Sequence, residues 1–291
     1  PEVAQIGARP ANLIDSGMWD NPEGYDATWE GMTGRGDRRW ASPGVVLDGK
    51  LVTTDLREIA EGVEESVEHS FFDSWSGGSH PYGKRTLPRR GARSWEGRYS
   101  WSTSARWRGR VVETGPGARL WATAMRGRMP YNPFISAEEG GVQLNLPEGA
   151  LPQLLMDWKP PTVWNAIERN RARLYGIVFA ALVAANEALN ALDLQKQDDV
   201  EASMEMSKLK PRGEARGVGF SGDGLMGHWL TLDGGSIANY QVVSPATFNA
   251  GPGGPIEEAV NGTPLLQDAV PGTEALMAVR SFDPCGNCAS T

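Results

Sequence analysis

The amino-acid sequence predicts a mixed α+β fold, rich in helix, with one long helix in a bundle and small β-hairpins at the periphery. Apolar residues recur at three- and four-residue spacing from 162 to 194, with no proline among them, as in a long amphipathic helix. Two turn sequences, Asp48-Gly49 and Asp233-Gly234-Gly235, lie between apolar runs and predict hairpins. Stretches rich in Gly, Pro, Ser and Trp predict loops between these elements.

The first 160 residues are expected to form a loop-rich part with short elements. Residues 45–52 should form the first hairpin, because an Asp-Gly pair readily adopts the positive φ angles of a tight turn. Thr54 or Asp55 should cap a helix that follows it. The side chains expected on one face of that helix are Leu56, Ile59, Val63 and Val67. A further helix and a short strand are predicted at 116–126 and 142–146.

Residues 161–291 are expected to contain the long helix, the second hairpin and a C-terminal motif. A helix of about 30 residues is about 45 Å long and must pack against other long helices. Its start carries Arg169, Arg171 and Arg173 near the positive end of the helix dipole, which is locally unfavourable. These arginines should pair with acids of a neighbouring segment or chain, or else form a plain solvated face. Thr273 should cap a last helix that ends near residue 281.

Composition limits the classes of function. The net charge of −8 over 291 residues argues against a general nucleic-acid binder. Residues 84–110 hold nine Lys or Arg and one acid, with three tryptophans, and we interpret them as a loop surface or protein interface. No run of 18 apolar residues and no secretory signal is visible, so no transmembrane segment is predicted. Two cysteines fit a reducing compartment, and we expect a cytoplasmic protein, with any membrane association through partners.

The only two cysteines, Cys285 and Cys288, form one Cys-x-x-Cys within the last seven residues. A thiolate pair is a strong ligand for soft metals, but two thiolates rarely complete a site, so other ligands would come from a second polypeptide. A thioredoxin-like redox pair, a small disulfide loop and a functionless tail are the alternatives that the spacing leaves open.

The segment from Arg280 to Ala289 resembles the C-terminal signature of NiFe hydrogenase large subunits, whose pattern is Asp-Pro-Cys-x-x-Cys-x-x-His. Further stretches are similar to the same family in the same order, above all to its uptake-type branch. These stretches are Gly36-Asp-Arg-Arg39, Glu113-Thr-Gly-Pro116, Trp164 to Arg173, Gly217-Val-Gly-Phe220, Gly227-His-Trp229, Asn239 to Asn249 and Gly254 to Ala259. The resemblance implies a hydrogenase large-subunit-like fold across nearly the whole chain.

The resemblance covers only about half of a family large subunit. The family's other half carries a first cysteine pair in an Arg-x-Cys-x-x-Cys motif, which this sequence lacks, and Pro1 lies in a stretch that resembles the middle of a family member. We therefore expect the C-terminal half of a split large subunit, separated by gene or by proteolysis. Its expected partners are the N-terminal half with the other cysteine pair and a small subunit with iron–sulfur clusters.

The resemblance also implies a metal centre. Cys285 would be a terminal nickel ligand, and Cys288 would bridge nickel and an iron that carries carbon monoxide and cyanide. The implied reaction is reversible oxidation of H2 to protons and electrons, with electrons passing to the small subunit. Cys285 and Cys288 are therefore the expected catalytic residues of a subunit that is inactive alone.

Three departures from the family pattern fall at this centre. Asp223 lies nearest the place of a family arginine, although Arg212 or Arg216 could substitute for it. Ala246, after Pro245, replaces a hydroxyl residue that donates to a cyanide. Thr291 replaces a terminal histidine that ligates magnesium, and its oxygens could still reach such a cation.

Asp223, His228, Pro245 and Ala246 are thus the residues expected beside the metals, with His228 ordering a loop by hydrogen bonding. Two accounts fit the departures. The pocket is re-tuned in a divergent hydrogenase, or the subunit has lost H2 chemistry and keeps a structural role in a redox complex. Retention of both cysteines favours the first account.

Overall fold

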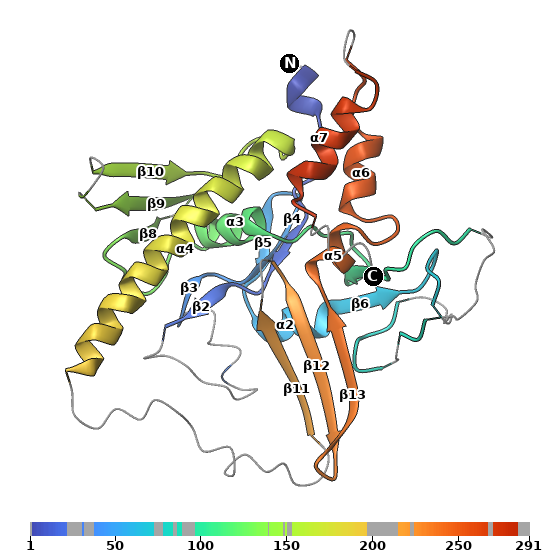
Figure 1. The fold of residues 1–291 in the computed structure, drawn as a ribbon, viewed down its shortest axis with the longest axis horizontal. Helices are drawn as coiled ribbons and strands as arrows, with labels where there is room; N and C mark the ends of the chain where they lie inside the picture. The colour runs from blue at the N-terminus through green and yellow to red at the C-terminus, as the bar shows by residue number, and fades with distance from the viewer. Residues whose placement is uncertain are drawn as a thin grey trace.

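The computed structural model describes residues 2–21, 31, 38–72, 78–83, 86–88, 97–138, 140–147, 149, 153–196, 215–221, 224–266 and 270–284. Figure 1 shows how the elements are arranged. The helical elements are η1 (Glu2–Gln5), α2 (Leu56–Gly62), α3 (Pro116–Arg126), α4 (Ala166–Gln195), α5 (Pro245–Asn249), α6 (Pro255–Asn261) and α7 (Thr273–Ser281).

The strands form small antiparallel sheets. Three-stranded sheets have the orders β1-β4-β5, β10-β9-β8 and β11-β12-β13, and β2 with β3 and β6 with β7 form pairs. Their bounds are β1 (Leu13–Asp15), β2 (Met18–Asp20), β3 (Arg39–Ala41), β4 (Gly44–Leu47), β5 (Lys50–Thr53), β6 (Val63–Ser66), β7 (Ser104–Trp107), β8 (Ile135–Glu138), β9 (Gly141–Leu146), β10 (Leu154–Trp158), β11 (Ala215–Ser221), β12 (Met226–Asp233) and β13 (Ser236–Val243).

The predicted mixed α+β class is confirmed, and so are both hairpins. β4 and β5 turn at Asp48 and Gly49, with φ of 49° and 77°. β12 and β13 turn at Gly234 and Gly235, with φ of 56° and 85°. The helix predicted at 116–126, the strand near 142–146 and the long helix also form, as α3, β9 and α4. The predicted boundary at residues 160 and 161 stays a prediction.

The helix predicted to run through Val67 is wrong in its second half. Asp55 caps α2 by accepting a hydrogen bond from the Arg57 N–H at 2.8 Å, as expected. The helix ends at Gly62 because the next residues pair with β7 as strand β6. A Cβ at Gly62 would lie 2.3 Å from Trp107 Nε1, so the helix end packs directly on that ring.

Two smaller features also differ from what the sequence predicts. The helix predicted over Leu56 to Val67 would end near His69, but His69 lies in a turn with φ of 63°, and its Nδ1 is 2.6 Å from the Gly97 carbonyl oxygen. Thr273 does not cap α7, because the capping position is Gly272, which has φ of 85° and no side chain to accept a hydrogen bond.

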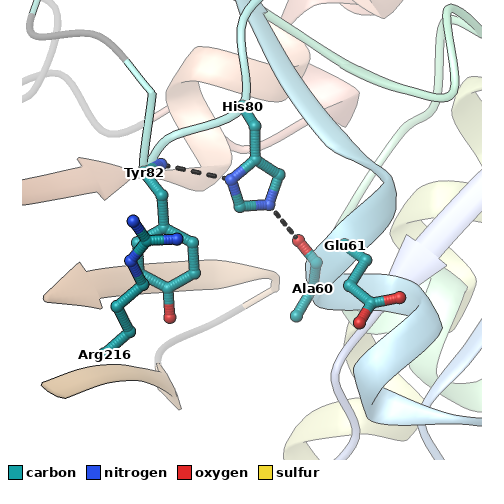
Figure 2. Close-up of a pocket in the computed structure, with 5 residues that line it drawn as sticks. All are labelled: Ala60, Glu61, His80, Tyr82 and Arg216. Carbon is teal, nitrogen blue, oxygen red and sulfur yellow. Dashed lines mark hydrogen bonds between the residues drawn. The ribbon is translucent and has the colours of Figure 1, made fainter. Parts of the chain in front are cut away.

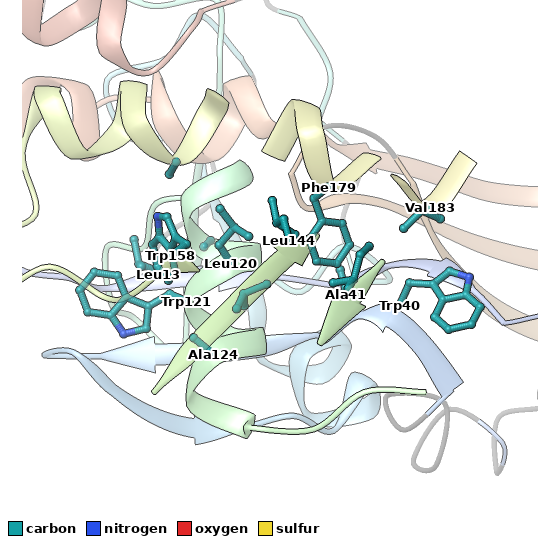
Figure 3. Packing of buried hydrophobic residues seen from close by; sticks show 14 of the residues in the cluster. Leu13, Trp40, Ala41, Leu120, Trp121, Ala124, Leu144, Trp158, Phe179 and Val183 are labelled. Atoms are coloured by element: carbon teal, nitrogen blue, oxygen red, sulfur yellow. The ribbon is translucent and has the colours of Figure 1, made fainter. Parts of the chain in front are cut away.

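The larger core lies between α3, α4 and the β8–β10 sheet (Figure 3). Trp121 of α3 packs edge-to-face on Trp158 and Trp164, with ring centroids 6.3 and 5.7 Å apart. Phe179 and Val183 bring the inner side of α4 into the same cluster. Because these side chains are almost fully buried, this core fixes α4 against α3.

Among the described helices, α4 alone is long and apolar enough to cross a membrane by length and composition. The expectation that the chain has no transmembrane segment stays a prediction. One such helix is weak evidence for a membrane span, because core helices of soluble proteins pass the same test. In this structure α4 contacts α3, α7 and β9 along its inner side.

Candidate metal centre

Four of the residues predicted at the metal centre, Asp223, Cys285, Cys288 and Thr291, lie outside the described residues. The structure therefore shows what surrounds and leads into the centre. The described chain reaches Pro284 next to the cysteine motif, and the predicted neighbours His228, Pro245 and Ala246 are all described.

Arg173 of α4 holds the turn that leads into the cysteine motif. Its Nη2 donates to the carbonyl oxygens of Arg280 and Ser281, at 3.3 and 3.0 Å. Its Nε lies 3.4 Å from Asp283 Oδ2. Asp283 has φ of 50°, in the left-handed region, so the chain turns here from the α7 axis. Arg173 therefore fixes where the chain leaves α7, two residues before Cys285.

Arg169, one turn earlier on α4, anchors the same turn from the buried side. Its guanidinium carbon lies 4.0 Å from the centre of the Phe282 ring, a cation–π contact. Its Nε and Nη2 donate to the two oxygens of Glu113 at 2.8 and 2.9 Å. Arg171 pairs with Glu168 on its own helix at 2.6 Å. The predicted pairing with acids of another segment is therefore confirmed for Arg169 and Arg173, whereas Arg171 pairs within its own helix.

Glu113 is the centre of this buried network. Besides Arg169, Arg9 Nη1 and Trp164 Nε1 donate to Glu113 Oε2 at 3.3 and 3.0 Å. Burial alone would raise the pKa of this carboxyl, but Arg169, Arg9 and the Trp164 hydrogen bond outweigh burial and lower it below 4.5. Glu113 therefore stays ionised, and two buried arginines share its charge.

The next residue, Thr114, joins two other family-like stretches to this network. Its Oγ1 accepts a hydrogen bond from the Leu225 N–H, and its own N–H donates to Asn249 Oδ1 at 3.0 Å. Asn249 Nδ2 donates back to the Thr114 carbonyl oxygen at 2.9 Å. A Cβ at Gly224 would lie 3.0 Å from Thr114 Oγ1, and Gly224 has φ of 119°, so only glycine fits this approach.

The Glu113–Pro116 stretch therefore connects the start of α4, the segment directly after Asp223 and the end of α5. The sequence indicated each stretch by resemblance, but not these contacts between them. The cluster of arginines at the start of the long helix was the one local pattern that predicted ion pairs for Arg169 and Arg173. No local pattern predicted the contacts of Arg9 or Asn249.

His228 is half-buried on β12 and interacts with the neighbouring strand. Its Nδ1 lies 2.7 Å from the Tyr240 hydroxyl oxygen, and the two rings stack with centroids 6.0 Å apart. The next residue, Trp229, is fully buried in the second core. His228 thus has the hydrogen-bonding role that was expected, and its partner is Tyr240 on β13. Its place beside the metals stays a prediction.

Pro245 and Ala246 are half-buried in the first turn of α5. Ser244 caps this helix by accepting from the Thr247 N–H at 3.3 Å, and Thr247 Oγ1 lies 3.1 Å from Ser244 Oγ in a capping box. The Thr247 hydroxyl is thus engaged in the cap, and Ala246 offers a methyl group where the family has a donor.

A cavity of about 260 Å³ lies beside the end of α2 and is lined by Ala60, Glu61, His80, Tyr82 and Arg216 (Figure 2). The Tyr82 N–H donates to His80 Nδ1 at 3.1 Å, so His80 Nε2 carries the proton and donates to the Ala60 carbonyl oxygen at 3.0 Å. Both ring nitrogens are therefore engaged, as the expected hydrogen-bonding role requires.

Arg216 does not fit the role of a substitute for the family arginine. It pairs with Thr231 on β12, whereas Ser221, at the other end of β11, pairs with Met226. Five residues of strand separate the two positions, roughly 17 Å. The Arg216 guanidinium instead lies 5.7 Å from the Tyr82 ring centre. Arg212, the other candidate, lies outside the described residues.

The residue types of the Cys-x-x-Cys motif fit half of a nickel–iron centre. Cys285 and Cys288 would supply two soft anionic ligands, the type that nickel and low-valent iron prefer. In the part of the chain that the structure describes, no group of three or more His, Cys, Asp or Glu could hold a metal. Further ligands would have to come from outside the described residues.

Comparison with known proteins identifies relatives over nearly the whole chain. The model of the nickel-dependent hydrogenase family matches residues 22–290. The uptake hydrogenase large subunit of Rubrivivax gelatinosus is 31% identical over 98% of this chain, and that of Rhodobacter capsulatus is 32% identical over 83% of it.

Solved structures show the same relationship. The actinobacterial-type NiFe-hydrogenase from Ralstonia eutropha H16 superposes with a TM-score of 0.86 at 33% identity, covering 100% of this chain and 58% of that one. A NiFeSe-hydrogenase from Dm. baculatum gives 0.65 at 26% identity, covering 99% and 53%. The chain spans about half the length of the curated relatives, 50% for Rubrivivax gelatinosus and 43% for Rhodobacter capsulatus.

Proposed function

This chain belongs to the nickel-dependent hydrogenase family, and on that premise we propose that it is the C-terminal half of a large subunit that oxidises H2 reversibly. Cys285 and Cys288 would hold nickel and iron, and the other two thiolates would come from an N-terminal half. Electrons would leave to an iron–sulfur small subunit. The complex would lie in the cytoplasm, because a chain whose only cysteines form a single Cys-x-x-Cys suits a reducing compartment.

The observation that supports this proposal most is how Arg169 and Arg173 hold residues 280–283. A ligand pair at a chain end needs a fixed approach, because thiolates must reach the metals in a set geometry. Here α4 fixes that approach, and Glu113 fixes α4 through Arg169. A frayed tail would not require three such contacts on its last helical turn.

The metals, with carbon monoxide and cyanide on iron, would supply the site at which H2 is split. The residues of this chain would position that site. Thr114 and Asn249 would hold the segment after Asp223 near α5, and Arg173 would direct the cysteine motif toward it. Magnesium at Thr291 is part of the same proposal, since a hydroxyl oxygen is a ligand that this cation accepts.

The test is H2-dependent reduction of a viologen dye by the complex purified from its source. We expect activity in the native complex and its loss, by about 100-fold or more, in Cys288→Ser, because an alkoxide-type ligand does not replace a soft bridging thiolate. Cys288→Ser with unchanged activity would contradict the proposal.

A second candidate is a non-catalytic structural subunit of a redox complex. The observation in its favour is that Ala246 provides no donor and that Thr247 is engaged in the α5 cap. An intact native complex that contains the iron–sulfur clusters but neither nickel nor H2 activity would select this candidate.

A further inference from the structure

Glu65 of β6 is a buried carboxyl group that the proposed function leaves without a role. The residue is 3% exposed, the Thr103 hydroxyl donates to its Oε1 at 2.6 Å, and Gln241 Nε2 donates to its Oε2 at 2.8 Å. In the described part of the chain, no Lys, Arg or His forms an ion pair with it. Burial therefore raises the pKa of this carboxyl above 4.5, and the two hydrogen bonds only partly oppose that rise. Glu65 thus differs from Glu113, whose charge two arginines share.

The first donor, Gln241, lies on the strand that leads into α5. β13 ends at Val243, and the next residue, Ser244, caps the helix. Gln241 is buried, and its Nε2 also donates to Thr86 Oγ1 at 2.9 Å, so the amide is held between two acceptors. Without Glu65 one N–H of this buried amide would lose its partner. Glu65 therefore fixes the strand just before α5.

The second donor, Thr103, lies in the segment that packs on the chain after α5. The carbonyl oxygens of Thr103 and Thr247 approach Gly251 so closely that no Cβ would fit there. Next to Thr103, Ser104 Oγ donates to the Pro252 carbonyl oxygen at 2.6 Å. Through Thr103, Glu65 therefore also reaches the segment just after α5.

The two oxygens of Glu65 thus bind the segments on either side of one short helix. We propose that Glu65 is a positioning residue of the metal centre, which sets the place of α5 through Gln241 and Thr103. This helix carries Pro245 and Ala246, which are expected beside the metals. The inference rests on the proposed function, because it names a residue that places part of the proposed metal site.

Stability alone does not account for a carboxyl group at this position. Burying it without a cation costs free energy, and an apolar side chain would avoid that cost. The carboxyl adds two acceptor oxygens in one rigid plane. Donors that lie 38 and 176 positions away in the sequence therefore meet at a single side chain. This geometry suits a group that fixes two segments relative to each other.

The test measures H2-dependent viologen reduction and backbone hydrogen exchange of α5 in the native complex. Glu65→Leu removes both acceptors, so exchange of the Phe248 and Ala250 N–H groups, which close the turns of α5, should rise about tenfold. The value of kcat should fall about tenfold or more, with nickel retained, because a displaced α5 misplaces the metal site. An unchanged kcat and unchanged exchange in Glu65→Leu would overturn the proposal.

The matched control is Ser70→Ala, close to β6 in the sequence. It removes another buried hydrogen bond, from Ser70 Oγ to the Ser102 carbonyl oxygen at 2.6 Å, but this bond does not lead to α5. We expect neither kcat nor the exchange of α5 to change in this variant. Changes as large as those in Glu65→Leu would show a general loss of stability and would overturn the proposal.

Glu65→Gln separates hydrogen bonding from charge. Its amide oxygen can accept from Gln241 and its amide nitrogen can donate to the Thr103 hydroxyl, so both contacts remain. We expect kcat and the exchange of α5 to stay within about threefold of the native values. Values as poor as those of Glu65→Leu would overturn the proposal.

Gln241→Asn gives the same test if Glu65→Leu fails to assemble. It draws the amide back from Glu65 by one methylene and changes little volume. We expect kcat to fall about fivefold and the exchange of α5 to rise by a similar factor. No change in either quantity would overturn the proposal.

The outcomes also separate this inference from the proposed function. Faster exchange of α5 in Glu65→Leu, in a complex whose native form holds no nickel, would refute the proposed function and support the hold of Glu65 on α5. Full nickel content and full H2 activity, with the exchange of α5 unchanged in Glu65→Leu, would refute the positioning role alone.

Discussion

The two sides of α4 differ in charge and in burial. The inner side carries Arg169, paired with a buried carboxylate, and Phe179, which is 2% exposed. The opposite side carries Ile167, Leu174 and Ile177, which are uncharged and exposed. Polarity alone therefore does not decide which residues of this helix are buried. A buried arginine is tolerated here because a buried carboxylate pairs with it and accepts its hydrogen bonds.

The largest expected effect tests the ion pair on the inner side. Glu113→Gln leaves Arg169 and Arg9 buried with one partner neutralised, which should lower the free energy of unfolding by about 3–5 kcal/mol. The matched control is Glu258→Gln, whose side chain is 42% exposed in its pair with Arg9 and should cost under about 1 kcal/mol. Urea unfolding measures the free energy of unfolding of both variants. Equal losses would contradict the assignment of Glu113 as the centre of the buried ion-pair network.

The same variant has a defined pH dependence. The pKa of Glu113 is lowered below 4.5 in the folded chain, so its stabilising contribution is present above about pH 4.5 and is lost as the pH falls through the lowered value. The stability gap between the native chain and Glu113→Gln should therefore narrow in acid. A gap that widens on acidification would show that this carboxyl is not the stabilising anion.

The two sides can be compared directly by truncation. Phe179→Ala removes a buried ring from the larger core and should cost about 3–5 kcal/mol. Leu174→Ala, five positions earlier and 64% exposed, should change the free energy of unfolding by under about 0.5 kcal/mol. Thermal unfolding of the two variants separates these effects. Equal losses of stability would contradict the assignment of Phe179 to the larger core.

A smaller effect is expected at the exit of α7. Arg173→Gln removes two hydrogen bonds and one ion pair and should cost about 1–2 kcal/mol. Arg171→Gln removes an ion pair within α4 and a hydrogen bond to the Lys159 carbonyl oxygen, and should cost about 1 kcal/mol or less. Because only Arg173 contacts the turn before the cysteines, only its variant should also lower the nickel content of the complex. Equal loss of nickel in Arg173→Gln and Arg171→Gln would contradict the specific role of Arg173 in placing the cysteine motif.

The smallest predicted change concerns the start of α4. Asn165 accepts a hydrogen bond from the Glu168 N–H at 3.0 Å and caps the helix. Asn165→Ala removes the cap and the hydrogen bond from Nδ2 to the Ala4 carbonyl oxygen and should cost about 1 kcal/mol, whereas Asn165→Asp keeps the cap, loses only the second bond and should cost less. Differential scanning calorimetry of the two variants would show it, and equal melting temperatures would contradict the assignment of this cap.

Short sequence patterns were sufficient to predict those elements whose conformation depends mainly on neighbouring residues. Asp48-Gly49 and Gly234-Gly235 set their own turns, and the periodicity of 162–194 gave α4. The prediction failed at Val63, because β6 pairs with residues about forty positions later and that pairing overrides helical periodicity. The absence of a cap on α7 depends on Gly272 rather than on the threonine beside it.

The candidate ligands come from the sequence alone, and they stay predictions because Cys285 and Cys288 lie outside the described residues. The Cys-x-x-Cys motif was recognisable because the family pattern is a linear string of residues. The contacts that lead into it could not be predicted in the same way. Glu113 contacts Arg169 across 56 positions, and Thr114 contacts Asn249 across 135. No spacing rule relates such residues before the fold brings them together.

The most direct test of the central claim, that this chain completes half of a nickel–iron centre, is metal analysis of the intact native complex beside its Cys285→Ser form. The account predicts about one nickel per complex in the native form and its loss in Cys285→Ser, while iron in the small-subunit clusters remains. Nickel absent from the native complex, or retained in full without the Cys285 thiolate, would contradict it.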